Sequence, residues 1–295
     1  MFNLKKVIFK GCGTAIATPF DENGVNLDEF AQLVEDQIQN NVDSIIVCGT
    51  TGESATMTEE ERLATIECAC KVSQGRVPII AGTGSNNTKA VIEMNKKVEK
   101  LGVDGVLIVT PYYNKTTGDG LIKHYTEIAK NTKLPIIIYN VPSRTGVNIK
   151  PEIAFELSKI ENIVAIKEAS GDLSQVAKIA NLCKDNLNIY SGNDDQILPV
   201  LSLGGIGVIS VLSNVKPKYT HDMCYSFFNK EVESATKMQI DAIPLINALF
   251  SEVNPIPVKA ALNILGYNYG EPRLPLVKIS NENRKKLEKA LNDLN

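Results

Sequence analysis

Short runs of apolar, mostly β-branched residues recur along the chain. We interpret eight of them as strands, at residues 14–18, 44–48, 77–81, 105–110, 135–140, 163–167, 187–190 and 206–211. Most of these runs lack polar alternation, which is typical of strands covered on both faces in a parallel sheet. The pattern therefore predicts a buried parallel sheet.

Helical patterns fill the intervals between these runs. Apolar residues recur at helical spacing in two clear cases: Leu27, Phe30, Val34 and Ile38, and Val91, Met94, Val98 and Leu101. Three pairs have the spacing of a helix-capping box: Asn26 with Glu29, Thr58 with Glu61, and Asp172 with Gln175. Strand and helix alternate along the chain.

This order of elements fits either an open doubly wound sheet or a closed barrel. Eight βα units over about 220 residues favour the (β/α)8 TIM barrel. We therefore expect an α/β fold, with a barrel catalytic domain at residues 1–225 and a C-terminal helical subdomain at residues 226–295. The tail has helically spaced apolar residues and no further strand run: Val232, Ala235 and Met238; Ala260, Ala261 and Ile264; Leu287, Leu291 and Leu294.

Composition narrows the class of partner. Hydrophobic residues make up 43% of the 295 residues, and no apolar run approaches the roughly 18 residues of a membrane-spanning helix. Lys and Arg total 31 against 34 for Asp and Glu, and the net charge of -3 argues against nucleic-acid and anionic membrane surfaces. The first residues lack a signal-peptide core. We expect a cytoplasmic protein that acts on a small molecule.

Signals for metal and phosphate sites are weak. Cys68 and Cys70, the one close pair among six cysteines, fit an apolar helix face better than a zinc site. We expect no metal ion and no cofactor. Residues 204–207, Gly-Gly-Ile-Gly, fit either a barrel phosphate site or a turn that needs glycine. His124 and His221 are isolated and are expected on helix surfaces or in packing.

Unusual polar residues follow the predicted strands, at the end where such a barrel has its active site. The second strand leads into Gly49-Thr50-Thr51-Gly52-Glu53, whose hydroxyls and backbone N–H groups can hold a carboxylate or an oxyanion. Tyr112 and Tyr113 follow the fourth strand, and Tyr139 and Arg144 lie near the end of the fifth. Taken singly, each loop is also compatible with an ordinary turn, packing or a surface charge.

Lys167 is the strongest single candidate. It closes an otherwise apolar run, and a partly desolvated ammonium is readily deprotonated to a nucleophile. The alternative is a snorkelling lysine paired with Glu168. Convergence favours the nucleophile, because six polar residues fall at the same end of nearby strands: Thr50, Thr51, Tyr113, Tyr139, Arg144 and Lys167.

The order and spacing of these motifs resemble the dihydrodipicolinate synthase and N-acetylneuraminate lyase family of Schiff-base aldolases. The resemblance rests on residues 49–53, 112–113, 139–146 and Lys167, and it covers essentially the full chain. Within this family, Thr50-Thr51, Tyr113 and Arg144 resemble the motifs of the synthase branch more than those of the sialic acid lyases. The resemblance implies condensation of pyruvate with L-aspartate 4-semialdehyde in diaminopimelate and lysine biosynthesis.

The resemblance also implies the catalytic residues. Lys167 would form the Schiff base with pyruvate. Tyr139, Thr50 and Tyr113 would relay protons, with Tyr113 contributed across a subunit interface. A homotetramer built from tight dimers is implied as well.

Four residues would bind the substrates, again by resemblance. Thr51 and the backbone near Ile209 would hold the pyruvate carboxylate, and Arg144 would orient the semialdehyde carboxylate. Gly192 is the fourth substrate-binding residue. Two other functions stay open: a sister aldolase acting on a sugar acid or a hydroxyproline-derived substrate, and a non-catalytic 2-oxo-acid binding protein.

Lysine-sensitive relatives bind lysine between subunits. In this chain Glu59 and Arg62 stand where histidines are typical, and Ala90 replaces an acidic residue. We therefore expect weak or no inhibition by lysine.

Overall fold

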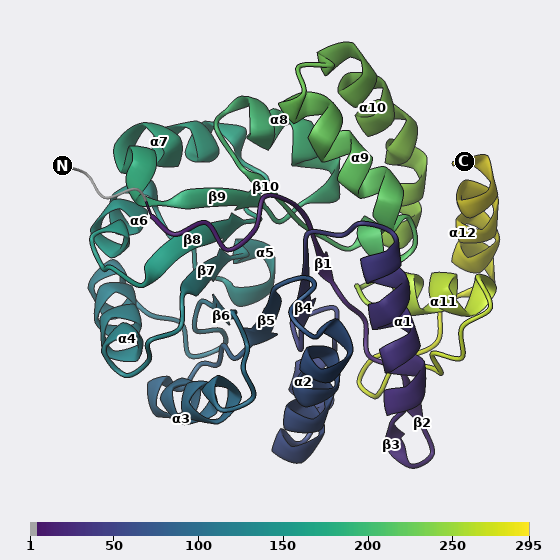
Figure 1. The fold of residues 1–295 in the computed structure, drawn as a ribbon, viewed down its shortest axis with the longest axis horizontal. Coiled ribbons are helices and arrows are strands. Elements are labelled where there is room, and N and C mark those ends of the chain that lie inside the picture. The colour runs from purple at the N-terminus through teal and green to yellow at the C-terminus, as the bar shows by residue number, and fades with distance from the viewer. Residues whose placement is uncertain (1–4, 295) are drawn as a thin grey trace. The chain divides into compact units, whose positions relative to one another are not determined.

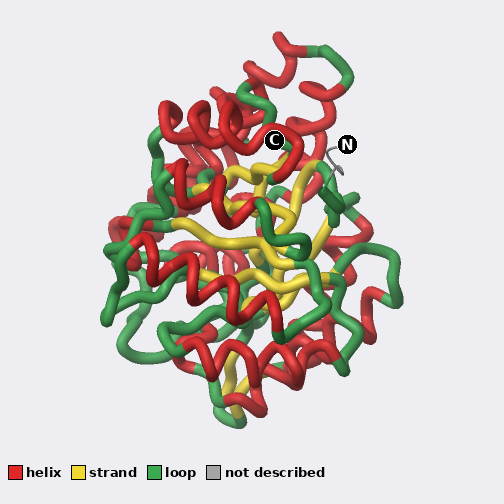
Figure 2. Tube along the Cα trace, turned by 90° about the vertical axis from the view of Figure 1, so that its left-hand side faces the viewer, coloured by secondary structure: helices red, strands yellow, loops and turns green. Residues whose placement is uncertain are grey.

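The computed structural model describes residues 5–294, in which strands alternate with helices (Figure 2). Eight parallel strands close into a barrel in the order β1-β10-β9-β8-β7-β6-β5-β4. Their bounds are β1 (Gly11–Ala15), β4 (Ser44–Val47), β5 (Ile79–Gly82), β6 (Gly105–Val109), β7 (Ile136–Asn140), β8 (Ile163–Glu168), β9 (Asn188–Ser191) and β10 (Gly207–Ser210). The expected (β/α)8 barrel is confirmed.

The first compact unit contains residues 5–10 and 80–209. In Figure 1 its strands β6 to β9 run side by side in teal and green. Its α-helices are α3 (Thr88–Glu99), α4 (Gly118–Lys130), α5 (Pro142–Thr145), α6 (Pro151–Ser158), α7 (Leu173–Cys183) and α8 (Ile197–Ser202). The strands of this unit are buried almost throughout, which explains their continuous apolar sequences.

The second unit contains residues 11–79 and 210–294. Its α-helices are α1 (Leu27–Gln39), α2 (Glu59–Ser73), α9 (Pro217–Phe228), α10 (Val232–Leu249), α11 (Ile256–Ile264) and α12 (Asn281–Asp293). The three helices expected in the tail are α10, α11 and α12, which pack against one another. The helical extension is thus confirmed, whereas a domain boundary at residue 225 stays a prediction.

Several strand boundaries were predicted wrongly. The first strand was expected at 14–18, but β1 ends at Ala15. Beyond it, Ile16 N still donates to Ile46 O at 3.1 Å. Ala17 N instead donates to Asn214 Oδ1, and Thr18 Oγ1 donates to Gly52 O, so residues 17–18 are held through side-chain groups rather than by a ladder. The third strand was expected from residue 77, but β5 starts after Pro78, which has no N–H to donate.

Only one of the three expected capping boxes is complete. Thr58 N donates to Glu61 Oε2 at 2.9 Å, and Glu61 N donates to Thr58 Oγ1 at 3.2 Å. Asn26 and Asp172 cap their helices through the side chain alone. The Gln175 side chain turns away from the cap and donates to Glu168 Oε2 at 3.2 Å.

A short hairpin was missed by the sequence analysis. Strand β2 (Phe20–Asp21) pairs antiparallel with β3 (Gly24–Val25) across the two-residue turn Glu22-Asn23, and Gly24 begins β3 with φ +125°. The sequence left two interpretations open for Gly-Gly-Ile-Gly at residues 204–207. Gly204 has φ +93°, so the backbone turn itself requires glycine there.

The two histidines take part in packing. His124 is buried, and its Nδ1 lies 2.9 Å from Thr88 Oγ1. His221 Nδ1 lies 3.0 Å from Asp43 Oδ2, and its ring stacks on Tyr225. Within residues 5–294, no helix is both long and apolar enough to cross a bilayer.

Candidate active site

Lys167 is buried near the carboxyl end of β8. It is 5% exposed, and its Nζ lies 4.4 Å from the centroid of the Tyr139 ring. Tyr139 and Lys167 are direct neighbours in the ladder between β7 and β8, so the register of the sheet brings the two side chains together. The ammonium thus has an aromatic face and little water around it.

Burial lowers the pKa of Lys167 from its usual 10.5 to about 8. The negative charge of Asp194 opposes this shift, and the positive charge of Arg144 adds to it. At pH 7 roughly a tenth of the amine is then neutral, compared with less than about a thousandth for an ordinary lysine. Lys167 is therefore poised as a nucleophile.

Arg144 lies in α5, a single turn that begins at Pro142 directly after β7. Its side chain is exposed, and the helix ends at Gly146 with φ +69°. An exposed guanidinium close enough to influence the pKa of Lys167 can receive the carboxylate of an incoming ligand.

Gly192 makes room for Lys167. A Cβ at this position would lie 3.1 Å from Lys167 Cε and 2.6 Å from Ala169 Cβ. Its N–H donates to Glu168 O at 2.7 Å, so the chain after β9 is held against β8. A side chain at 192 would displace the lysine.

A network of amides surrounds the buried carboxylate of Glu168, the residue next to Lys167. Glu168 Oε1 accepts from Ser170 N at 2.7 Å, and Oε2 accepts from Asn140 Nδ2 at 2.9 Å. Asn140 is itself next to Tyr139 in β7. The network therefore ties together the two strand ends that carry Lys167 and Tyr139, and Glu168 does not act as an ion-pair partner that would neutralise the lysine.

Tyr113 lies on the surface of the first unit. Its side chain is 91% exposed, and its backbone has the left-handed φ of +67°. Asn86 fixes the neighbouring backbone, since its Nδ2 donates to Tyr112 O at 3.2 Å and its O accepts from Asn114 Nδ2 at 3.0 Å. The chain thus holds an aromatic side chain out into solvent.

The segment Gly49–Glu53, which we call the threonine loop, belongs to the second unit. Thr51 is buried, and Thr50 is partly exposed. Glu53 N donates to Thr50 O at 3.1 Å, which closes the turn. The loop presents two hydroxyls at the carboxyl end of β4. In the first unit, Ile209 of β10 is fully buried and can offer only its backbone.

The C-terminal segment makes direct contacts with the threonine loop. Asn254 Nδ2 donates to Thr51 Oγ1 at 3.0 Å, and Lys259 Nζ lies 2.9 Å from Glu53 Oε1. Sequence analysis missed Asn254 and Lys259, which follow no strand and interrupt no motif. It also missed Asp194, although this residue comes soon after β9, where the same search at strand ends would have found it.

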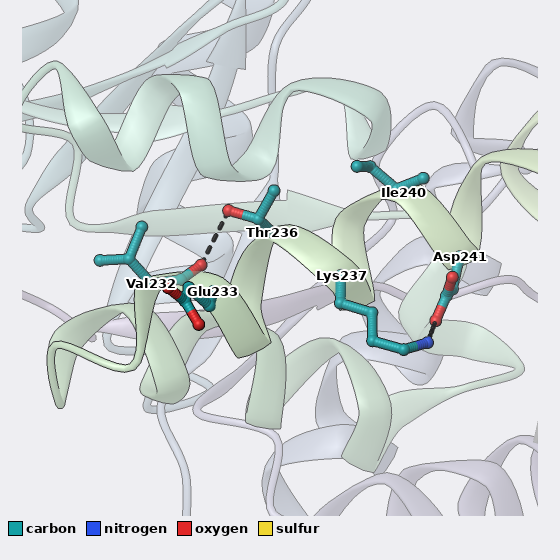
Figure 3. Close-up of a pocket in the computed structure, with 6 residues that line it drawn as sticks. All are labelled: Val232, Glu233, Thr236, Lys237, Ile240 and Asp241. Atoms are coloured by element: carbon teal, nitrogen blue, oxygen red, sulfur yellow. Dashed lines mark hydrogen bonds and ion pairs between the residues drawn. The ribbon is translucent and has the colours of Figure 1, made fainter.

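A hollow of about 410 Å³ lies along one face of α10 (Figure 3). Six residues line it: Val232, Glu233, Thr236, Lys237, Ile240 and Asp241. Its one lysine, Lys237, pairs with Asp241, and its side chain is 77% exposed. The hollow therefore lacks the desolvated amine that distinguishes Lys167. Within residues 5–294, no cluster of three His, Cys, Asp or Glu side chains is placed to hold a metal ion.

Comparisons with known proteins agree with one another. The model of the dihydrodipicolinate synthetase family matches residues 8–294. A 4-hydroxy-tetrahydrodipicolinate synthase of Clostridium acetobutylicum is 54% identical over 284 residues, which are 96% of this chain and 97% of that protein. The crystal structure of a dihydrodipicolinate synthase from Thermotoga maritima has a TM-score of 0.96 at 43% identity, covering 98% of this chain and 99% of that one.

A second solved structure, described as a monomeric dihydrodipicolinate synthase variant, has a TM-score of 0.96 at 43% identity, with 97% of each chain covered. The family and the synthase activity expected from the sequence are confirmed by these relatives, and that activity belongs to the lyase class of enzymes. With a family match over nearly its whole length, the chain belongs to the dihydrodipicolinate synthetase family.

Proposed function

We propose that the chain condenses pyruvate with L-aspartate 4-semialdehyde through a Schiff base on Lys167, giving 4-hydroxy-tetrahydrodipicolinate. The relatives named for this activity support the reaction. One observation carries the mechanism: a buried lysine amine, held over Tyr139, with a pKa lowered to about 8. Schiff-base chemistry needs such a neutral amine.

The reaction follows from the amine. Nζ of Lys167 adds to the ketone carbon of pyruvate, and loss of water leaves a protonated imine. The positive nitrogen draws electrons from the methyl group, which loses a proton to give an enamine. The enamine carbon attacks the aldehyde carbon, and the aldehyde oxygen takes up a proton. The substrate's own amine then adds to the imine carbon and expels Lys167 as the ring closes.

The proton transfers are assigned to Tyr139, Thr50 and Tyr113. Tyr139 is the phenol beside the amine. In a parallel barrel the carboxyl ends of all strands open on one face, which supports a shared role for the threonine loop and Lys167. We assign the pyruvate carboxylate to the Thr51 hydroxyl, with Gly192 and the Ile209 backbone lining its site. None of these steps requires a cofactor.

The exposed position of Tyr113 supports assembly with a second copy of the chain. A tyrosine that is 91% exposed, on backbone held by Asn86, is suited to reach into a neighbouring subunit. We infer a homo-oligomer, a tetramer of tight dimers, in which Tyr113 completes the relay. The cytoplasmic location expected from the sequence stays a prediction.

The two rival functions are less well supported. A sister aldolase would share Lys167 and Tyr139, but the relatives at 54–56% identity are named for the synthase reaction. A non-catalytic binding protein would not need the desolvated amine.

The test is to trap the Schiff base. Sodium borohydride added with pyruvate is expected to reduce the imine and leave a pyruvyl adduct on Lys167, identified by peptide mass spectrometry. The exposed Lys237 is the internal control and should stay unmodified. An adduct spread over surface lysines, or none in folded protein, would contradict the mechanism. Turnover with a panel of aldehydes then separates the synthase from a sister aldolase.

Arg144 has two separable effects. Replacing it with alanine removes a positive charge that lowers the pKa of Lys167, so the pH at which pyruvate kcat/KM reaches half its plateau should move above 8. The KM for the semialdehyde should rise about tenfold to hundredfold, as expected for loss of a charge-assisted hydrogen bond. The pyruvate KM should change much less.

Arg144→Lys is the matched control, because it keeps the charge and loses the bidentate fork. It should raise the semialdehyde KM and leave the pH profile near that of the wild type. An unchanged pH profile in Arg144→Ala, or equal effects on both substrates, would argue against the assignment.

A further inference from the structure

We propose that Asn254 is a positioning residue for pyruvate: from the C-terminal segment, it fixes the Thr51 hydroxyl as a hydrogen-bond donor to the substrate carboxylate. The inference rests on the proposed function, in which Thr51 holds that carboxylate. It gives the helical extension, which supplies none of the reacting groups, a direct part in substrate affinity.

The hydrogen bond between Asn254 and Thr51 has a defined direction. Asn254 Nδ2 lies 3.0 Å from Thr51 Oγ1, and both residues are buried. An amide N–H group only donates, so the bond occupies a lone pair of the Thr51 oxygen and leaves the hydroxyl proton for an acceptor. An ionised carboxylate only accepts. The contact therefore selects the orientation of Thr51 that suits a carboxylate ligand.

The backbone around the threonine loop is left-handed at two residues other than glycine. Cys48 just before the loop has φ +57°, and Glu53 at its end has φ +54°. Left-handed conformations cost about 1–3 kcal/mol for residues other than glycine, and they persist where the surroundings impose them. The loop therefore depends on contacts from outside to keep its shape.

The same C-terminal segment supplies those contacts. Glu53 Oε1 is held by Lys259 Nζ at 2.9 Å, and Glu53 Oε2 accepts from Arg273 N at 3.0 Å. Arg273 Nη1 also donates to Thr56 O at 3.0 Å. Asn254 thus holds the Thr51 hydroxyl, while Lys259 and Arg273 hold Glu53 at the end of the threonine loop. Of these contacts, only the one from Asn254 reaches a hydroxyl assigned to the substrate.

Two substitutions at 254 test the proposal. Asn254→Ala removes the donor and should raise the pyruvate KM about tenfold, the effect of one hydrogen bond. In Asn254→Asp the new carboxylate accepts the hydrogen bond of the Thr51 hydroxyl and repels the carboxylate of pyruvate. We therefore expect the pyruvate KM to rise about a hundredfold. In both variants kcat should fall less than about threefold, and the semialdehyde KM should stay within about twofold.

Asn263→Ala is the matched structural control. Asn263 lies in α11, donates from Nδ2 to Gly270 O at 3.0 Å and accepts from Tyr269 N at 2.8 Å, without touching the threonine loop. Its loss should lower the melting temperature and leave the pyruvate KM unchanged. If the Asn254 variants behave like this control, Asn254 is only structural and the proposal fails.

A double-mutant cycle with Thr51→Val gives a second test that does not depend on the absolute stability of one variant. In the Thr51→Val background, Asn254→Ala should have no further effect on the pyruvate KM, because the hydroxyl it orients is gone. Additive effects would overturn the proposal. Failure of the proposed function is distinguishable, since it appears as a missing borohydride adduct in the wild-type enzyme.

Discussion

Replacing Lys167 with methionine is expected to lower kcat by more than about a thousandfold while leaving the protein at least as stable as the wild type. Without the amine, no imine forms and pyruvate has no electron sink. The stability follows from the lowered pKa of Lys167, which means that burial disfavours its charged form. Methionine has a similar length and carries no charge to desolvate. Steady-state kinetics and thermal unfolding measure the two effects.

Lys159→Met provides the control for losing a lysine. Lys159 is on the same unit, pairs with Glu156 on the surface and should be replaceable with little effect on either quantity. Retention of a tenth or more of wild-type turnover by Lys167→Met would rule out the Schiff base as the main route. A drop in stability of several kcal/mol would contradict the view that the buried ammonium opposes folding.

The barrel could be predicted because each of its strands is marked by the residues of that strand alone. A strand covered on both faces needs an unbroken apolar run, and Ile136 to Ile138 or Ile163 to Ile166 leave few other interpretations. Strand ends were less predictable. Residues such as Ala17 and Thr18 are as buried as a strand, but Ala17 N donates to the side chain of Asn214, and the Thr18 side chain donates to the backbone oxygen of Gly52.

Lys167 and Tyr139 were predictable for a related reason: a polar group that closes an apolar run is conspicuous, and parallel strands bring their carboxyl ends together. The register between β7 and β8 then makes the two residues neighbours. The lowered pKa of Lys167 was not predictable, because Asp194 and Arg144, which follow different strands, influence the amine through space.

The contacts between the C-terminal segment and the threonine loop could not be predicted from sequence. Asn254 and Lys259 lie about two hundred positions from their partners Thr51 and Glu53, and neither disturbs a local pattern. Lys259 even sits in a mostly apolar helix, where a charged residue would ordinarily be placed on the surface.

Lys259→Met is expected to lower the free energy of unfolding by about 3–5 kcal/mol, because it leaves Glu53 buried without its cation. The two side chains of this ion pair are 1% and 2% exposed. A loss of this size should lower the melting temperature by roughly 5–15 °C. Lys237→Met, which removes the 77% exposed partner of a surface pair, should change the free energy by less than about 0.5 kcal/mol.

The double variant Glu53→Gln with Lys259→Met separates stability from positioning. Burial lowers the pKa of Lys259 even though Glu53 opposes the shift, so the attraction within the pair does not fully offset the desolvation of the ammonium. Removing both charges should therefore recover most of the lost stability, as measured by denaturant unfolding. We expect Lys259→Met to raise the pyruvate KM as well, and in the double variant this KM should stay raised, because residue 259 no longer holds the end of the threonine loop in either protein. If KM returned to the wild-type value along with stability, the ion pair would have no part in shaping the loop.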